Sequence, residues 1–184
     1  MMKKYAVIVF LFVISNLNLI AQAAESSDEK TPLPTTFREF SLGMNLEDLK
    51  TSLTKDSYFA FRGDRDVSYL PVSDQNLVES AGTSFIKRAF FQLKDSAIFI
   101  MAFTMNTGMI DHYSVFTAFV EKYGQPQVLS PKEAVWEQDN VRISIERPLT
   151  VKYIDKQVFD ALVDDSRVVR SRSAELREEF LDDF

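Results

Sequence analysis

The sequence predicts an α+β fold in which helices pack on one face of an antiparallel β-sheet. The first observation is the stretch 84–106, where aromatic and branched apolar runs lie on either side of a polar turn at 94–96. The second is a pair of segments, 45–55 and 111–123, with apolar residues at helical spacing and capping residues at their ends. Their order, a helix and then strands, occurs twice and allows two tandem α-β-β-β units, 37–106 and 107–154.

Residues 1–23 have the three-part signature of a secretory signal peptide. Lys3 and Lys4 form a basic start, residues 6–20 are almost continuously apolar, and Ala21-Gln22-Ala23 fits a cleavage site. The apolar run is shorter than the roughly 20 residues that span a bilayer, so we expect no transmembrane span after cleavage. Residues 24–36, which are polar and contain two prolines, are predicted to be a disordered leader.

The composition limits the cellular compartments and the classes of partner that the protein is expected to have. The chain has no Cys, which excludes a lipid-bearing Cys, disulfides and thiolate metal sites. A secreted domain without disulfides favours a bacterial protein, either periplasmic or secreted. The formal net charge of −6 gives no general attraction to nucleic acid. The 16 Phe imply a Phe-filled core or an apolar surface kept for a partner.

The first half of the predicted domain, 37–165, begins with a helix. Asn45 is its expected N-cap, and Leu46, Leu49 and Leu53 share one face. A strand pair is predicted at 58–62 and 67–72 around a polar turn at 63–66. Residues 73–82 are then expected to be a polar connection, with a short helical turn at 75–79, before the central hairpin.

The second half contains the clearest helix. Asp111 or Ser114 can cap its start, and Gly124 is expected at its C-terminal end. Short strands are predicted at 127–129, 141–146 and 151–154. In 141–146, apolar and polar residues alternate as in a strand with one face in the core. A helix follows from Lys156. Residues 166–184 form a charged amphipathic helix or tail that can fold back, fray or dock into a partner's groove.

No motif in the sequence predicts catalysis, metal binding or a cofactor. His112 is the single His and stands beside Asp111, but a triad also needs an activated nucleophile and an oxyanion site. Asp64 and Asp66 have the spacing that opens some calcium loops, yet the later Gly and Glu of such loops are missing. Adjacent carboxylates elsewhere do not converge on a helix. We therefore expect a protein that is not an enzyme and has no cofactor.

Two short patterns resemble those of a known family. They are Gly43-Met44 followed by the Leu46, Leu49 and Leu53 helix, and Tyr123-Gly124-Gln125-Pro126 followed by Trp136. The chain thereby resembles the SmpA/OmlA (BamE-like) envelope proteins and the related fold of the β-lactamase inhibitor protein. This resemblance implies helices packed on one face of an antiparallel sheet, and a non-enzymatic role in binding other envelope proteins. The lipid-bearing Cys of the envelope family is absent.

The leading hypothesis is an exported protein that binds another envelope or secreted protein. The alternative is a carrier of an apolar ligand such as a lipid, held by the Phe- and Met-rich sheet. A third reading, a hydrolase, rests on His112 alone. For each aromatic residue predicted as a partner contact, the alternative is a place in the hydrophobic core. The predicted contact residues are Tyr58, Phe61, Tyr69, Trp136, Tyr153, Leu176, Phe180 and Phe184.

Overall fold

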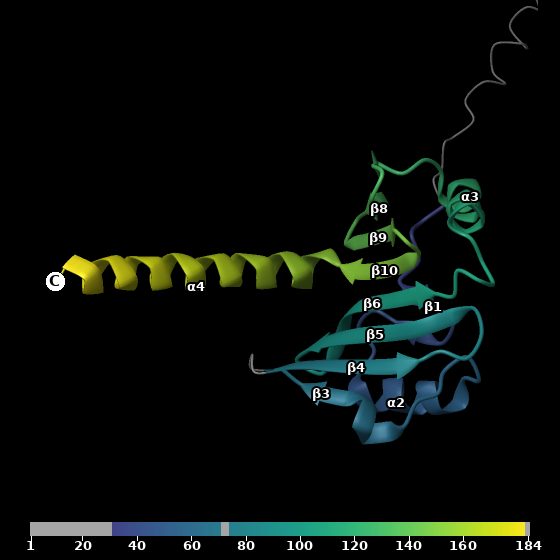
Figure 1. The fold of residues 1–184 in the computed structure, drawn as a ribbon, viewed down its shortest axis with the longest axis horizontal. Coiled ribbons are helices and arrows are strands. Elements are labelled where there is room, and N and C mark those ends of the chain that lie inside the picture. Colours follow the sequence, from purple (N-terminus) through teal and green to yellow (C-terminus); the bar gives the residue numbers. More distant parts are fainter. Residues whose placement is uncertain (1–30, 71–73, 183–184) are drawn as a thin grey trace, which may run out of the picture. The chain divides into compact units, whose positions relative to one another are not determined.

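The computed structural model describes residues 31–70 and 74–182. Within them it shows an eight-stranded antiparallel sheet, a two-stranded ribbon and three α-helices (Figure 1). The α+β class predicted from the sequence is confirmed. The elements are β1 (Thr36–Phe37), β2 (Phe40–Ser41), α2 (Leu46–Lys55), the 3-10 helix η1 (Gly63–Asp66), β3 (Val67–Tyr69), β4 (Gln75–Ala81), β5 (Ile86–Lys94), β6 (Ala97–Met105), α3 (His112–Tyr123), β7 (Val128–Leu129), β8 (Glu133–Gln138), β9 (Val141–Glu146), β10 (Thr150–Asp155) and α4 (Lys156–Asp182).

The order of the strands reflects the two predicted units. The eight-stranded sheet runs β3-β4-β5-β6-β10-β9-β8-β7, and every neighbouring pair is antiparallel. The first unit supplies α2 and then β3 to β6, and the second supplies α3 and then β7 to β10. Each helix is thus followed by four strands in the large sheet rather than the three expected. The last strands of the two units, β6 and β10, pair at the centre.

The central hairpin forms where the sequence predicts it. Asp95 and Ser96 both have positive φ, 50° and 63°, as a two-residue hairpin turn of type I′ requires. Phe91 lies opposite Met101 across the β5–β6 ladder, and both are buried. Side chains of one face of this hairpin enter the main core, while those of the other face lie on the side from which α4 emerges. Apolar residues on both faces explain why β6 is an almost continuous apolar run.

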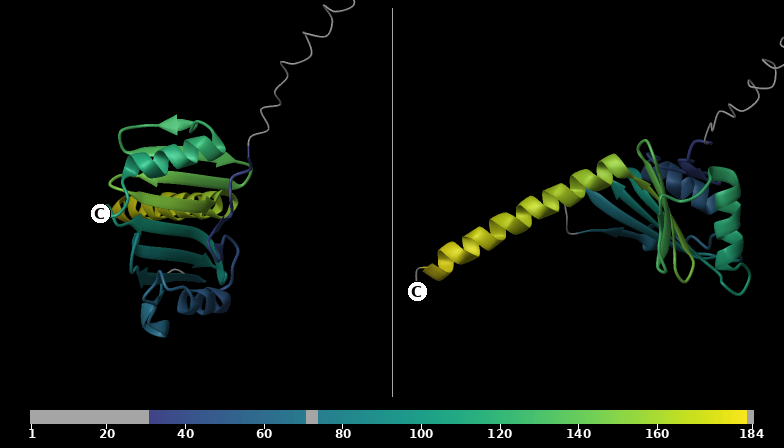
Figure 2. Two further views of the ribbon diagram at one scale, coloured as in Figure 1. Left: turned by 90° about the vertical axis from the view of Figure 1, so that its right-hand side faces the viewer. Right: turned by 90° about the horizontal axis from the view of Figure 1, so that it is seen from above.

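One face of the large sheet carries the hydrophobic core. Figure 2 shows α3 on this side and α4 leaving the sheet on the opposite side. The ring of Phe40, from the β1–β2 ribbon, lies 5.1 Å from the ring of Phe91 and 6.5 Å from that of Phe103. Phe116 and Phe119 of α3 pack on Trp136 of β8, at 6.0 and 5.5 Å between ring centroids. The core is therefore largely aromatic, which accounts for many of the Phe residues.

Local capping explains where α2 and α3 begin. The Asn45 side chain accepts a hydrogen bond of 2.9 Å from the backbone N–H of Asp48. Asp111 accepts one of 2.9 Å from the backbone N–H of Ser114, which settles the predicted choice between these two caps. Gly124 ends α3 with φ at 78°, a conformation that L side chains rarely adopt. Both helices thus lie where the sequence predicts them.

Two predictions between α2 and the central hairpin are wrong. Residues 58–62 are not a strand, and the expected turn at 63–66 is the 3-10 helix η1. The buried carboxylate of Asp66 causes this, because it accepts hydrogen bonds from the backbone N–H of Arg62 and from its guanidinium. β3 pairs instead with β4, which occupies the segment expected to be a polar connection with a helical turn.

The termini of the domain also differ from the prediction. The β1–β2 ribbon begins at Thr36, and the backbone N–H of Leu33 donates to the side chain of Gln138 at 3.3 Å, so the end of the expected leader belongs to the domain. At the other end, α4 is one helix that passes through the expected boundary at 165/166 without a break. The predicted signal peptide lies outside the described residues.

Candidate functional site

The face of the sheet that α2 and α3 leave open has an apolar centre and a charged margin. Strand alternation places polar side chains around an apolar strip on this face. At the margin, ion pairs join Arg88 to Glu79 at 2.8 Å and Lys152 to Glu146 at 2.7 Å. A cavity of about 440 Å³ lies above this face. The apolar strip consists of Leu77, Phe90, Ile100, Ala102 and Ile154, with Phe159 of α4 beside it.

The first part of α4 forms a groove with the sheet. The groove has a volume of about 640 Å³, and its sheet side comes from β4, β5 and β6. Its polar lining residues include Asp165 and Arg170 of α4. The apolar lining is Phe99, Ile100, Phe159, Leu162, Val163 and Val169. A groove of this size and composition can hold an apolar chain or an apolar side of another helix.

The apolar side of α4 continues beyond the groove. We call Val169, Leu176 and Phe180 the α4 stripe, because they follow each other at steps of seven and four residues on one side of the helix. They are 67%, 58% and 62% exposed. Leu181 beside them is exposed as well. A side of a helix with this composition is normally buried against another surface.

The middle of α4 carries positive charge in an otherwise acidic chain. Residues 166–177 contain four Arg and one Glu, whereas the whole chain has a net charge of −6. Arg167 is held by Asp164 of its own helix at 3.4 Å, while Arg170 donates to the backbone and hydroxyl oxygens of Ser166. The surface around the α4 stripe therefore complements a partner that has acidic residues beside an apolar groove.

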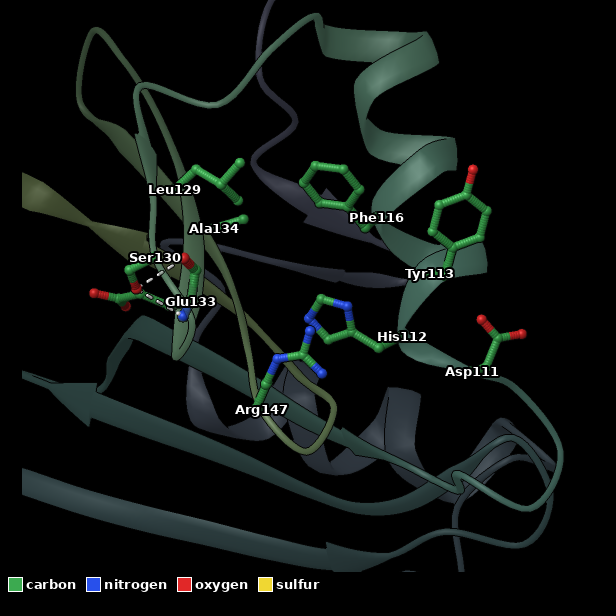
Figure 3. Close-up of a pocket in the computed structure, with 9 residues that line it drawn as sticks. All are labelled: Asp111, His112, Tyr113, Phe116, Leu129, Ser130, Glu133, Ala134 and Arg147. Carbon is green, nitrogen blue, oxygen red and sulfur yellow. Dashed lines mark hydrogen bonds between the residues drawn. The ribbon is translucent and has the colours of Figure 1, made fainter.

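A separate cavity lies on the α3 side of the sheet (Figure 3). It has a volume of about 470 Å³ and lies between the start of α3, the β7–β8 turn and the β9–β10 turn. His112 and Arg147 lie side by side at one end, and Phe116, Leu129 and Ala134 form the apolar wall (Figure 3). Burial, together with the positive charge of Arg147, holds the pKa of His112 below its ordinary value.

The structure separates the predicted contact residues into three groups. Trp136 and Tyr153 are 1% and 4% exposed, so the prediction that they form a contact surface is wrong. Trp136 lies under α3, where its indole N–H donates to the carbonyl of Gly124 at 2.8 Å. Burial raises the pKa of the Tyr153 hydroxyl well above its ordinary value. Both residues hold the core together.

Of the other predicted contacts, Tyr58 and Phe61 are half-buried and pack against the core. The Arg38 guanidinium lies 4.2 Å from the centre of the Tyr58 ring, which fixes that ring in place. Tyr69 is exposed on the edge strand β3 and does not line the groove beside α4. Leu176 and Phe180 are the members of the prediction that lie together on one exposed surface. Phe184 lies outside the described residues.

The residues of α4 that line the groove were not predicted from the sequence. Phe159, Leu162 and Val163 are recognisable as the apolar side of a helix, but the sequence does not show which face of the sheet that helix meets. The apolar side of this helix continues with one helical period through Val169 to Leu176 and Phe180. It thereby crosses the predicted boundary at 165/166. That continuity is the signal that could have joined the groove and the exposed end into one surface.

The described part of the chain offers no site for a metal ion. Among residues 31–70 and 74–182, no group of three or more His, Cys, Asp or Glu side chains is placed to hold one. Within the same residues, no helix is both long enough and apolar enough to cross a membrane.

The comparisons with known proteins identify one family. A family model described as the TP0088 domain matches residues 35–165, which is the part of the chain from the β1–β2 ribbon to the first third of α4. No curated protein and no solved structure matches the chain. The match ends before Val169, so the α4 stripe lies beyond the matched residues.

Proposed function

The chain belongs to the TP0088 domain family, and we propose that it is an exported, non-enzymatic protein that binds another envelope or secreted protein through α4. One observation carries this proposal: the apolar side of α4 continues past the groove as the exposed α4 stripe. Export rests on the signal-peptide pattern of residues 1–23. The resemblance to BamE-like envelope proteins is consistent with a binding role and stays a prediction.

The energetics of an exposed stripe favour a partner. Full burial of a Val, Leu or Phe side chain contributes about 1.5–3 kcal/mol. An isolated helix segment of this length is marginally stable in water, and packing of its apolar side supplies most of the stability of such helices in proteins. A partner that covers the α4 stripe would gain this apolar burial and stabilise the end of α4 at the same time.

The partner expected from this surface has an apolar groove flanked by acidic residues. An amphipathic helix that lays its apolar side into such a groove is a common recognition mode. Arg170, Arg172 and Arg177, which flank the α4 stripe on the helix, would meet the acidic residues of the partner. Such charge pairs set the orientation of the two proteins and raise the association rate more than they raise the affinity. The binding should therefore weaken as the salt concentration rises.

The test compares two double variants of the tagged protein with the wild type. Leu176→Ser with Phe180→Ser removes most of the α4 stripe. Arg167→Ser with Glu178→Ser is the matched control, because it makes the same number of changes to Ser on exposed positions of the same helix. Each is expressed with its own signal peptide, and the partners are captured from envelope extracts and identified by mass spectrometry.

We expect one partner that the control variant keeps and the stripe variant loses, with an affinity decrease of at least about 30-fold for the purified pair. Circular dichroism must show both variants folded. A partner that binds both variants equally well would contradict the proposal, and so would an equal loss in both.

The groove supports a second candidate, a carrier of an apolar ligand such as a lipid. Its apolar lining and volume of about 640 Å³ are the observation that favours this reading. Native mass spectrometry of protein purified without detergent separates the two candidates. A bound mass that Leu162→Ser removes supports the carrier, whereas an apo mass for protein that still captures its partner supports the binding protein.

A further inference from the structure

We propose that the cavity between α3 and the β7–β8 turn binds a monocarboxylate that carries an apolar group. The cavity lies at the start of α3 and the groove lies along α4, and Figure 2 shows these two helices on opposite sides of the sheet. The proposed site is therefore independent of the function proposed for α4.

Three segments far apart in the sequence converge on this cavity. The first two turns of α3 bring His112 and Phe116, the β7–β8 hairpin brings Leu129 and Ala134, and the turn before β10 brings Arg147. Its volume of about 470 Å³ falls within the range of about 300–1,000 Å³ that is usual for small-molecule sites. The cavity can therefore hold a ligand with several carbon atoms.

Arg147 is the charged group available to a ligand. Its side chain is exposed and forms no ion pair with any residue of the described part of the chain. Figure 3 shows its guanidinium beside the His112 ring, at the end of the cavity. A guanidinium offers two parallel N–H donors that match the two oxygens of a carboxylate.

The two acidic residues at the cavity do not neutralise this site. The Asp111 carboxylate accepts hydrogen bonds from the backbone N–H and the hydroxyl of Ser114, so it serves as the cap of α3. Glu133 precedes Ala134 on β8, and its side chain also lines the cavity on the open face of the sheet. In Figure 3 both carboxylates point away from the space between His112 and Leu129. The positive charge of Arg147 is thus left to attract an anion.

His112 adds a second polar contact and orients the ligand. Its ring is stacked on Phe116, with ring centroids 6.5 Å apart, and so it borders both the polar end and the apolar wall. A neutral imidazole donates one N–H, which together with the guanidinium suits a single carboxylate better than a doubly charged phosphate. The apolar part of the ligand would lie along Phe116, Leu129 and Ala134.

The experiment titrates the full mature protein with hydrocinnamate and follows the backbone amide signals by NMR. Hydrocinnamide, which has the same apolar body without charge, is the matched ligand control. N-acetyl-phenylalanine and its amide form a second pair, which distinguishes a free organic acid from the carboxyl end of a peptide. Arg147→Gln is compared with Lys132→Gln, a change of an exposed cation on the neighbouring turn that does not line the cavity.

We expect both carboxylates to shift signals of α3 and the β7–β8 turn, and Arg147→Gln to weaken that binding at least about tenfold. Lys132→Gln and the α4 stripe variant should bind like the wild type, which separates this proposal from that for α4. Tighter binding of N-acetyl-phenylalanine than of hydrocinnamate would identify the carboxyl end of a peptide, rather than a free organic acid, as the ligand. Equal binding of acid and amide, unchanged binding by Arg147→Gln, or no binding at millimolar ligand would overturn the proposal.

Discussion

At the scale of single residues, the pair of Arg38 and Asp56 joins the β1–β2 ribbon to the end of α2. Arg38 donates to both carboxylate oxygens of Asp56, at 2.7 and 3.1 Å, and the backbone N–H of Tyr58 donates to one of them at 2.9 Å. Burial alone raises the pKa of the Asp56 carboxyl, but these hydrogen bonds outweigh it and hold the pKa below its ordinary value. The ionised form therefore stabilises the fold.

We predict that Arg38→Gln lowers the free energy of unfolding by about 1–3 kcal/mol at neutral pH, because it leaves a buried carboxylate with fewer donors. A depressed pKa in the folded state gives stability that is present above the unfolded pKa of Asp and is lost as the pH falls through the folded pKa. The wild type and the variant should consequently converge in acid. Urea unfolding at neutral pH and at a pH below both values of the Asp56 pKa measures this difference.

Arg88→Gln is the matched control for that prediction. Arg88 pairs with Glu79 at 2.8 Å, but both side chains are substantially exposed. Exposed ion pairs contribute about 0–1 kcal/mol. A loss for Arg88→Gln as large as that for Arg38→Gln, or a difference for Arg38→Gln that persists in acid, would contradict the role given to Asp56.

For Trp136 and Tyr153, the residue type alone does not determine whether the side chain lies on a contact surface or in the core. Their aromatic nature suits a contact surface and a core equally well, since large amphipathic rings are common in both. Whether such a ring lies in the core depends on which face of the sheet it occupies, and that face is set by the register of the strands. Trp136 pairs with Ile143 across β8 and β9, and Tyr153 pairs with Met101 across β10 and β6, all on the covered face.

At the scale of elements, α4 has two parts with different surroundings. From Phe159 to Arg170 its side chains line the groove against the sheet. Beyond Arg170, exposed Leu176 and Phe180 continue the apolar side of the helix. A rise of about 1.5 Å per residue gives the 27 residues of α4 a length of about 40 Å.

We predict that a chain ending at Arg170 keeps the fold of the sheet and loses the partner. The groove lining is retained in that chain, so its midpoint of thermal unfolding should stay within a few degrees of the wild type. A chain ending at Asp155 instead loses Phe159, Leu162 and Val163 and should unfold at a clearly lower temperature. Differential scanning calorimetry and partner capture measure the two effects.

A large loss of stability in the chain ending at Arg170 would show that the end of α4 packs on its own domain. The α4 stripe would then be an internal contact rather than a surface for a partner.

The elements that could be predicted from the sequence are those with local signals. Asn45, Asp111 and Gly124 mark helix ends through backbone hydrogen bonds and φ, and the polar turn at 94–96 marks the hairpin. The strand β4 was missed because its polar residues are stabilised by ladders to β3 and β5, which are not local. The 3-10 helix η1 depends on the hydrogen bonds that the carboxylate of Asp66 makes with Arg62.

At the scale of the whole described domain, the two faces of the sheet have different chemistry. The covered face holds the aromatic core and, at the start of α3, the cavity with Arg147. The open face holds the apolar strip, the groove and α4. A change at Arg147 should therefore leave partner binding intact, and a change in the α4 stripe should leave carboxylate binding intact, because the cavity with Arg147 shares no lining residue with the groove or with the α4 stripe.

The measurement that tests the central claim most directly is photo-crosslinking in cells from single positions on α4. A photoreactive residue replaces Leu176 in one strain and Arg167 in another. These positions are nine residues apart, which at about 100° per residue places them on opposite sides of the helix. We predict that position 176 crosslinks to one protein partner and that position 167 does not. Equal crosslinking from both positions, a crosslink only to a second copy of this chain, or none from position 176 would contradict the claim that the α4 stripe binds another protein.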